Sequence, residues 1–214
     1  MTVMQLQGLV THKNKNIYIP LLTMVFLILY SGSGALSIKS AGMLPLSSWE
    51  SAIPFLPWTI WIYIVFYPLY LIWALYNYQD EVQMNKTLYG FIILTVISCL
   101  IFVLFPITYP RSFFPLPLDN DITTLLFRGM RKLDNPSNCL PSLHVGLCYL
   151  FAYGLLTESR KKFIIAIASS TLIAISTLTT KQHYFLDILA GFLLSTLIYV
   201  FFRAKTHIKI KPTD

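Results

Sequence analysis

The stretch that decides the fold is HYFLDILAGFLLSTLIYVFF, residues 183–202. An α-helix needs about 20 such residues to cross the hydrocarbon core of a bilayer. His183 and Asp187 stand in the first turn of this stretch. Without that turn the apolar part is too short to span, so we expect Asp187 to lie at membrane depth and to need a partner.

The rest of the chain is similarly apolar. Of 214 residues, 56% are hydrophobic and 12% are charged, and the mean hydropathy is +0.64. A soluble domain carries about 25% charged residues, so this composition excludes an ordinary soluble globule and a disordered chain. The net charge of +7 comes from basic residues in short loops and tails. That distribution is typical of membrane topology and argues against nucleic acid as a partner.

Six apolar runs predict an all-α, polytopic membrane protein with about six transmembrane helices in one bundle. The runs are about Ile17–Ile38, Pro57–Tyr76, Leu88–Ile107, Leu140–Thr157, Phe163–Thr180 and His183–Phe202. We expect a single membrane domain over residues 1–214, with its motif-bearing core at about 50–203 and short basic tails. The first run also resembles a cleavable signal peptide, although its length favours a retained span.

Aromatic and small side chains in the runs predict how the helices are placed. Aromatic residues in the second run are typical of an interfacial belt: Trp58, Trp61, Tyr63, Tyr70 and Trp73. Small residues mark places where helices can pack closely: Gly32, Gly34, Gly191 and Ser195.

The loop between residues 108 and 139 contains a short amphipathic segment. Its apolar face carries Ile122, Leu125, Leu126, Met130 and Leu133, and its basic face carries Arg128, Arg131 and Lys132. With Asp121 as N-cap, we expect a short interfacial helix on the membrane surface. Most Lys and Arg residues lie in the tails and the 158–162 loop, so these segments should face the cytoplasm. The 108–139 loop would then face the periplasm or exterior of a plasma membrane, the bacterial inner membrane being the expected one.

The few ionisable side chains at membrane depth gather at one predicted end of the bundle. They are Arg111, His144, Lys181, His183 and Asp187. Such groups are costly in a membrane and usually functional. His183 and Asp187 are four residues apart and would share a helical face. The carboxylate would then fix the imidazole tautomer and leave the other ring nitrogen free as a base or nucleophile.

The segment Pro141-Ser142-Leu143-His144 opens the fourth run. We expect Pro141 at the first helical position, where the free N–H groups and the helix dipole form an anion site. The Ser142 hydroxyl, the Arg111 guanidinium and the Lys181 ammonium are donors suited to phosphate oxygens. A lone helical histidine is more often structural, and a basic residue beside a span is usually an anchor. So many polar groups on one side nevertheless favour a phosphate-handling site.

The three cysteines form no ligand pattern in the sequence. Cys99 and Cys148 lie inside apolar runs, and Cys139 lies at the edge of one. No CxxC or Cys/His ligand spacing is present, which argues against a zinc site. A disulfide framework is also not expected, since two of the three cysteines lie at membrane depth. We expect neither a bound metal nor a cofactor.

These residues resemble the motifs of the type 2 phosphatidic acid phosphatase superfamily. Its second motif is Pro-Ser-Gly-His, which residues 141–144 match with Leu in place of Gly. Its third motif is Ser-Arg, five residues, His, three residues, Asp; residues 176–187 fit this spacing with Thr177 in place of Arg. Of its first motif, Lys, six residues, Arg-Pro, only Arg111 remains, with Leu104 at the lysine position.

The departures from these motifs are similar to one branch of the superfamily. Pro-Ser-Leu-His, together with residues 180–184 and 53–55, resembles the inositol phosphorylceramide synthase-like branch and its bacterial relatives. The resemblance covers about residues 50–191. Because two family cations are replaced, Lys181 is expected to compensate, and Arg128 and Arg131 are candidates to fold over the site.

The resemblance implies metal-independent phosphoryl transfer in a six-helix membrane fold. It assigns His183 as the nucleophile that forms a phosphohistidine, Asp187 as the group that orients it, and His144 as the acid that protonates the leaving alcohol. The residues that would hold the phosphoryl oxygens are Arg111, Ser142 and Lys181.

The expected function is that of an integral membrane lipid phosphatase. It would hydrolyse a lipid phosphomonoester or diphosphate at the outer face, with the lipid phosphate and the bilayer as its partners. A lipid phosphotransferase, in which an alcohol replaces water, uses the same residues and stays open. A non-catalytic lipid-binding or transport protein is the second alternative. The lipid, the acceptor alcohol and the oligomeric state are left open by the sequence.

Overall fold

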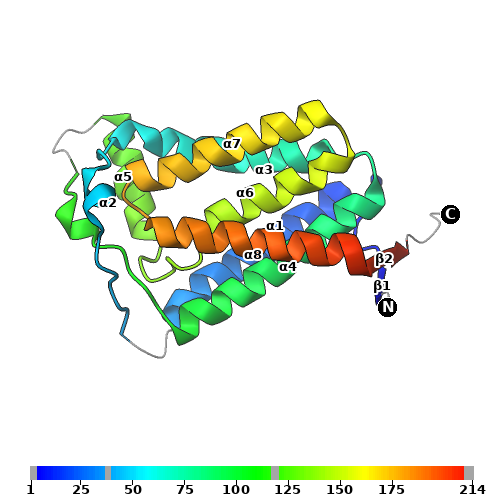
Figure 1. Cartoon of the computed structure of the whole chain (residues 1–214), viewed down its shortest axis with the longest axis horizontal. Helices are drawn as coiled ribbons and strands as arrows, with labels where there is room; N and C mark the ends of the chain where they lie inside the picture. The colour runs from blue at the N-terminus through cyan, green and yellow to red at the C-terminus, as the bar shows by residue number, and fades with distance from the viewer. Residues whose placement is uncertain (1–3, 37–39, 117–120, 210–214) are drawn as a thin grey trace.

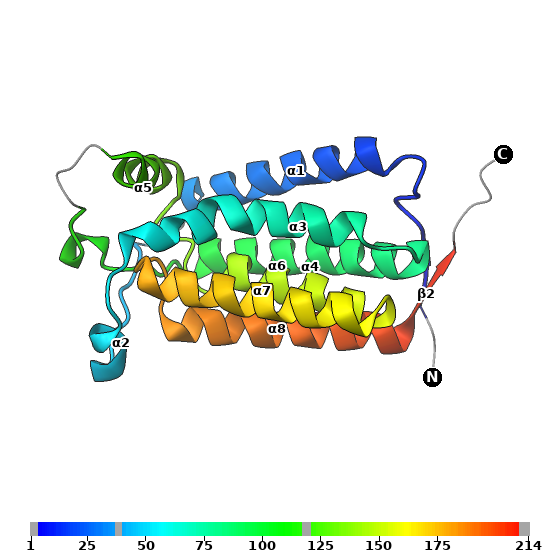
Figure 2. The same cartoon turned by 90° about the horizontal axis from the view of Figure 1, so that it is seen from above.

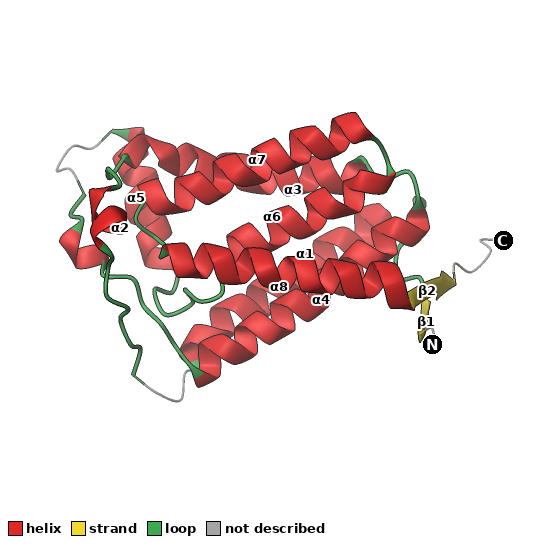
Figure 3. Ribbon diagram, viewed as in Figure 1, coloured by secondary structure: helices red, strands yellow, loops and turns green. Residues whose placement is uncertain are grey.

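The computed structural model describes residues 4–36, 40–116 and 121–209, in which the chain is mainly helical, as predicted (Figures 1 and 3). The elements, in chain order, are β1 (Met4–Gln7), α1 (Lys15–Ala35), α2 (Ser48–Ala52), η1 (Pro57–Thr59), η2 (Trp61–Phe66), α3 (Tyr67–Tyr76), α4 (Glu81–Leu104), η3 (Arg111–Phe113), α5 (Ile122–Leu133), α6 (Leu143–Gly154), η4 (Leu155–Thr157), α7 (Arg160–Thr179), α8 (Phe185–Lys205) and β2 (Thr206–Lys209). The expected end of the first run, at residues 37–38, lies outside the described residues.

Five helices among the described residues are long and apolar enough to cross a membrane. They are α1, α4, α7, α8 and the continuous segment Pro57–Tyr76, which joins η1, η2 and α3. The fourth predicted run is shorter than expected, because its helical part covers only Leu143–Thr157. Ser142 is the N-cap of α6, so Pro141 precedes the cap and does not occupy the first helical position that we predicted.

The short helix α6 lies in the middle of the bundle and contacts α3, α4, α7 and α8 (Figure 1). Nine of its 12 residues are buried, so its neighbours are protein side chains. Hydroxyl groups of the surrounding segments reach its main chain. Tyr70 donates to the Cys148 carbonyl oxygen at 2.9 Å, and Tyr78 donates to that of Phe151 at 3.0 Å. A helix enclosed in this way does not need the full length of a bilayer.

The backbones of α6 and α8 meet at Gly191. A Cβ atom at this position would lie 2.4 Å from the carbonyl oxygen of Ser142, so only glycine fits. Close by, the Ser142 N–H donates to the Asp187 carbonyl oxygen at 3.0 Å. Close packing at a small residue is therefore confirmed for Gly191. It is wrong for Gly32, where a Cβ atom would meet nothing within 4 Å.

The two ends of the bundle differ. Helices α2 and α5 lie at one end, and both termini lie at the other (Figures 1 and 2). The first residues of α6 and α8 and the last residues of α7 lie at the α5 end, so the predicted ionisable groups are brought to one end. At the opposite end β1 and β2 pair in parallel, with Met4 opposite Thr206. This short pair is not among the elements predicted from the sequence.

The second run is only partly an interfacial belt. Trp58 and Trp61 are exposed, as a belt requires. Tyr63 and Tyr70 are instead buried, each with 3% of its surface exposed. The prediction that these two tyrosines face the membrane interface is therefore wrong, because they turn towards α6 and use their hydroxyl groups inside the bundle.

The short helix predicted in the outer loop is present as α5. Its N-cap is Asp121, whose carboxylate accepts from the Thr124 N–H at 2.7 Å, as expected. Phe127 and Met130 are buried against the second run, while Leu125 and Leu133 are exposed. The helix thus attaches to the bundle by one face and presents apolar side chains on another.

Candidate active site

The turn before α8 holds an imidazole and a carboxylate together. His183 Nδ1 lies 3.2 Å from Asp187 Oδ2, and the same oxygen accepts from the Tyr184 N–H at 2.9 Å. The helix begins only at Phe185, so the pair does not share a helical face as predicted. It forms because Asp187, in the first turn, folds back over the N-cap residue. Only 5% of His183 and none of Asp187 is exposed.

A second imidazole faces this pair from α6. The ring centroids of His144 and His183 lie 6.0 Å apart, with an angle of 61° between the ring planes. His144 is the second residue of α6, and Ser142 caps that helix by accepting from the Val145 N–H at 3.4 Å. Ser142 itself is buried, with 1% of its surface exposed. His144, His183 and Asp187 therefore lie together, as predicted.

Two tyrosines of the second run surround His144. The ring centroid of Tyr63 lies 4.4 Å from that of His144 in a stacked arrangement, and its hydroxyl lies 3.4 Å from Nδ1. The Tyr67 ring centroid lies 4.7 Å away. A hydroxyl near one ring nitrogen fixes the imidazole orientation and leaves Nε2 to face the site. These contacts were not predicted, because the sequence pattern assigns Tyr63 to the interfacial belt.

The Arg111 guanidinium is held by a carboxylate that the sequence analysis did not identify. Asp134 accepts from Arg111 through a side-chain oxygen and through its carbonyl oxygen, the latter at 3.2 Å. Its other carboxylate oxygen accepts from the Tyr30 hydroxyl on α1. Arg111 is therefore positioned by α1 and by the end of α5.

Arg131 of α5 is the second guanidinium here. It donates to the Phe114 carbonyl oxygen at 2.8 Å and lies over the Phe127 ring. Burial, followed by the nearby charge of Arg111, lowers the pKa of Arg131 from its ordinary value. Within the described residues, the buried Nε atoms of Arg111 and Arg131 have no hydrogen-bond partner. Two close cations with unused donors are suited to an anion.

The Lys181 side chain contacts the α2 segment and Phe114. Its ammonium donates to the Glu50 carbonyl oxygen at 3.0 Å and lies 4.8 Å from the centroid of the Phe114 ring. Burial lowers the pKa of Lys181, and the Glu50 charge opposes this effect. The structure therefore gives Lys181 a partner in the α2 segment, and its predicted contact with phosphate oxygens stays a prediction.

The backbone at Lys181 is unusual. Its φ angle is 54°, in the left-handed region that favours glycine. It follows α7 in a Schellman arrangement, in which Lys181 N–H donates to Leu178 and Gln182 N–H donates to Thr177. A lysine at this helix end costs about 1 kcal/mol relative to glycine. Left-handed backbone of this kind is often found at functional sites.

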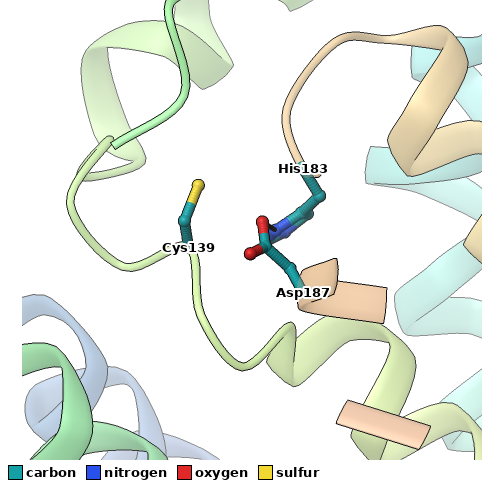
Figure 4. Close-up of side chains that lie close together, drawn as sticks. All are labelled: Cys139, His183 and Asp187. Carbon is teal, nitrogen blue, oxygen red and sulfur yellow. Dashed lines mark hydrogen bonds and ion pairs between the residues drawn. The ribbon is translucent and has the colours of Figure 1, made fainter. Parts of the chain in front are cut away.

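Cys139 lies across from the His183–Asp187 pair, in the loop before α6 (Figure 4). Its thiol donates to the Gln182 carbonyl oxygen at 3.4 Å. Burial, followed by the negative charge of Asp187, raises the pKa of Cys139 well above its ordinary value, and Arg111 opposes this. No feature of the sequence predicted that Cys139 lies near the histidines.

An apolar cavity of about 690 Å³ adjoins His144. It lies between α1, α5 and the second run, and its apolar lining includes Phe26, Leu27, Ile64, Leu125, Leu126 and Met130. His144 and Asp134 are at its polar edge. A second apolar cavity of about 570 Å³ lies further along α1 and α3 and shares Phe26, Leu27 and Tyr67 with the first.

Comparisons with known proteins agree with the motifs. No curated protein and no solved structure matches the chain. The family model of the PAP2 superfamily, however, matches residues 45–201, which is well over half of the chain and includes His144, His183 and Asp187 but not the residues that α1 contributes. The chain belongs to the PAP2 superfamily.

Proposed function

We propose that the protein is a membrane phosphatase that hydrolyses a lipid phosphomonoester or diphosphate at its α5 end. PAP2 superfamily membership supports an enzyme of the phosphatase or phosphotransferase type. The observation that carries the finer proposal is the pair of imidazoles with centroids 6.0 Å apart, one of them bound to a buried carboxylate. Rings this close can both reach the same phosphoryl group, one as nucleophile and the other as acid.

In the proposed reaction, His183 Nε2 attacks phosphorus, and the bond between phosphorus and the lipid oxygen breaks. Protonated His144 gives its proton to the departing lipid oxygen. Water then attacks the phosphohistidine, neutral His144 accepts a proton from this water, and inorganic phosphate leaves. Asp187 holds the Nδ1 proton of His183 throughout and stabilises the positive charge that develops on the ring.

The charge on the phosphoryl oxygens needs donors around it. We propose that the Ser142 hydroxyl at the α6 N-cap and the unpaired Nε–H groups of Arg111 and Arg131 supply them. Donors fixed before the reaction stabilise the charge spread over the equatorial oxygens. Arg131 is thereby added to the predicted phosphate-binding residues. Its positive charge would compensate in part for the two family cations that are replaced at Leu104 and Thr177.

The apolar cavities support a lipid substrate. The 690 Å³ cavity ends at His144, and the 570 Å³ cavity continues it between α1 and α3, deeper among the spanning helices. A hydrocarbon chain in these cavities would leave its phosphate beside His144. Burying each CH₂ group of such a chain contributes about 0.8 kcal/mol to binding.

The test is a set of lipid phosphates presented to the purified protein in detergent, without added metal. His183→Ala should abolish phosphate release, whereas His12→Ala, a histidine outside the bundle core, should leave it unchanged. Release that is undiminished by His183→Ala refutes the nucleophile. A labelled lipid that yields a new phosphodiester in place of inorganic phosphate would reassign the activity to transfer onto an alcohol.

A further inference from the structure

Three side chains with different ligand atoms converge next to the proposed nucleophile. The Cys139 sulfur, a His183 ring nitrogen and an Asp187 carboxylate oxygen all lie within 4.8 Å of one another. All three residues are buried (Figure 4). They come from the loop before α6, the turn before α8 and the first turn of α8, which explains why no ligand spacing is visible in the sequence.

The donor set favours zinc over the hard cations magnesium and calcium. Thiolate, imidazole and carboxylate together suit zinc, whereas magnesium and calcium prefer oxygen ligands only. Ligands on a tetrahedral zinc ion, at about 2.0–2.3 Å from the metal, lie about 3.3–3.8 Å from one another. The distances between the three donor atoms, now within 4.8 Å, would therefore shorten by about 1 Å when the ion binds. Asp187 Oδ1 is buried and has no partner among the described residues, so it is available to bind.

We propose that Cys139, His183 and Asp187 form a zinc site, with water in the fourth position, and that zinc bound there inhibits the enzyme. The inhibitory effect rests on the proposed function, because it requires His183 to be the nucleophile. The metal site itself rests only on the three donors.

The inhibition follows from the ring nitrogen that the metal takes. His183 faces Asp187 with Nδ1, which must carry the proton if Nε2 is to attack phosphorus. Zinc on Nδ1 requires the Nδ1 lone pair, so the ring proton moves to Nε2 and the nucleophilic lone pair is lost. The Cys139 thiol releases one proton to the solvent as it binds. Asp187 is also withdrawn from its role in orienting the ring.

The test uses cobalt as a spectroscopic substitute for zinc in the full-length protein. Cobalt bound to a thiolate absorbs in the near ultraviolet, and this band should appear on titration of the wild-type protein. It should disappear in Cys139→Ala and persist in Cys148→Ala, the matched control with a buried cysteine in α6. Cys139→Ser provides a second variant if the alanine variant does not fold.

Zinc inhibition of phosphate release is measured on the same proteins. The zinc concentration for half-inhibition should rise at least about tenfold in Cys139→Ala, since loss of even an outer partner of a metal ligand weakens binding about 10–100-fold. Equal zinc sensitivity of Cys139→Ala and wild type, or absence of the cobalt band from the wild type, overturns the proposal. A cobalt band without any lipid phosphatase activity supports the site and overturns the proposed function. Phosphatase activity without the cobalt band supports the proposed function and overturns the metal site.

Discussion

The most direct test of the proposed chemistry is Asp187→Asn. One carboxylate oxygen, Oδ2, receives both His183 Nδ1 and the Tyr184 N–H. An asparagine carbonyl oxygen in the same place can accept both hydrogen bonds, so the ring tautomer and the turn should be kept. The substitution therefore removes the negative charge and little else.

The magnitude follows from the distance. Two unit charges 3.2 Å apart, as for His183 Nδ1 and Asp187 Oδ2, attract by about 5 kcal/mol at an effective dielectric constant of about 20. Each 1.36 kcal/mol of transition-state stabilisation is about a factor of ten in rate. We therefore expect Asp187→Asn to lower kcat about 10³–10⁴-fold.

The assay is phosphate release from a micellar lipid phosphate, with the melting temperature of each variant measured beside it. Asp187→Asn should melt close to the wild type. Asp187→Ala should be less stable by about 1–3 kcal/mol, because the buried Tyr184 N–H loses its acceptor. A folded Asp187→Asn protein with activity within about tenfold of wild type would refute the proposed role of the charge.

Four further expectations can be checked by substitution. His144→Ala should slow release of a poor leaving alcohol far more than that of nitrophenol, measured as the ratio of the two rates; equal slowing argues against an acid. Lys181→Gly should keep the melting temperature, since relief of the left-handed backbone offsets the lost hydrogen bond to Glu50, and should raise KM for the lipid phosphate if the ammonium binds it. Gly191→Ala should destabilise the protein by about 1–3 kcal/mol and lower activity by separating α6 from α8, whereas Gly129→Ala, in helix α5 with open space around it, should raise the melting temperature slightly because alanine is the better helix former. Arg128→Cys should react with an impermeant thiol reagent added outside intact cells, and labelling only after lysis would invert the topology.

Much of the helical architecture could be predicted because hydropathy and length determine it directly. Five predicted runs are present as long helices, and α5 begins at the predicted N-cap, Asp121. The prediction that His144 and His183 converge was possible because charged and titratable groups are rare at membrane depth. Both histidines are predicted at the same end of their helices, so in one bundle they lie at the same depth.

The partners of these groups could not be predicted. Asp134 lies in a loop 23 residues after Arg111, and no periodic pattern relates the two. Cys139 is close to His183 only because the loop before α6 turns across the start of α8. Tyr63 has the sequence setting of a belt residue, and its burial depends on the rotation of its helix about the axis, which hydropathy does not encode.

The contact between Ser142 and Asp187 has a consequence for how this scaffold can change. The spacing of the two imidazoles depends on a main-chain hydrogen bond of 3.0 Å and on a glycine with no room for a side chain. The walls beside His144 are instead made of interchangeable aliphatic and aromatic groups on α1 and α5. Substitutions in those walls can change which hydrophobic tail the cavity binds, while the two imidazoles keep their spacing.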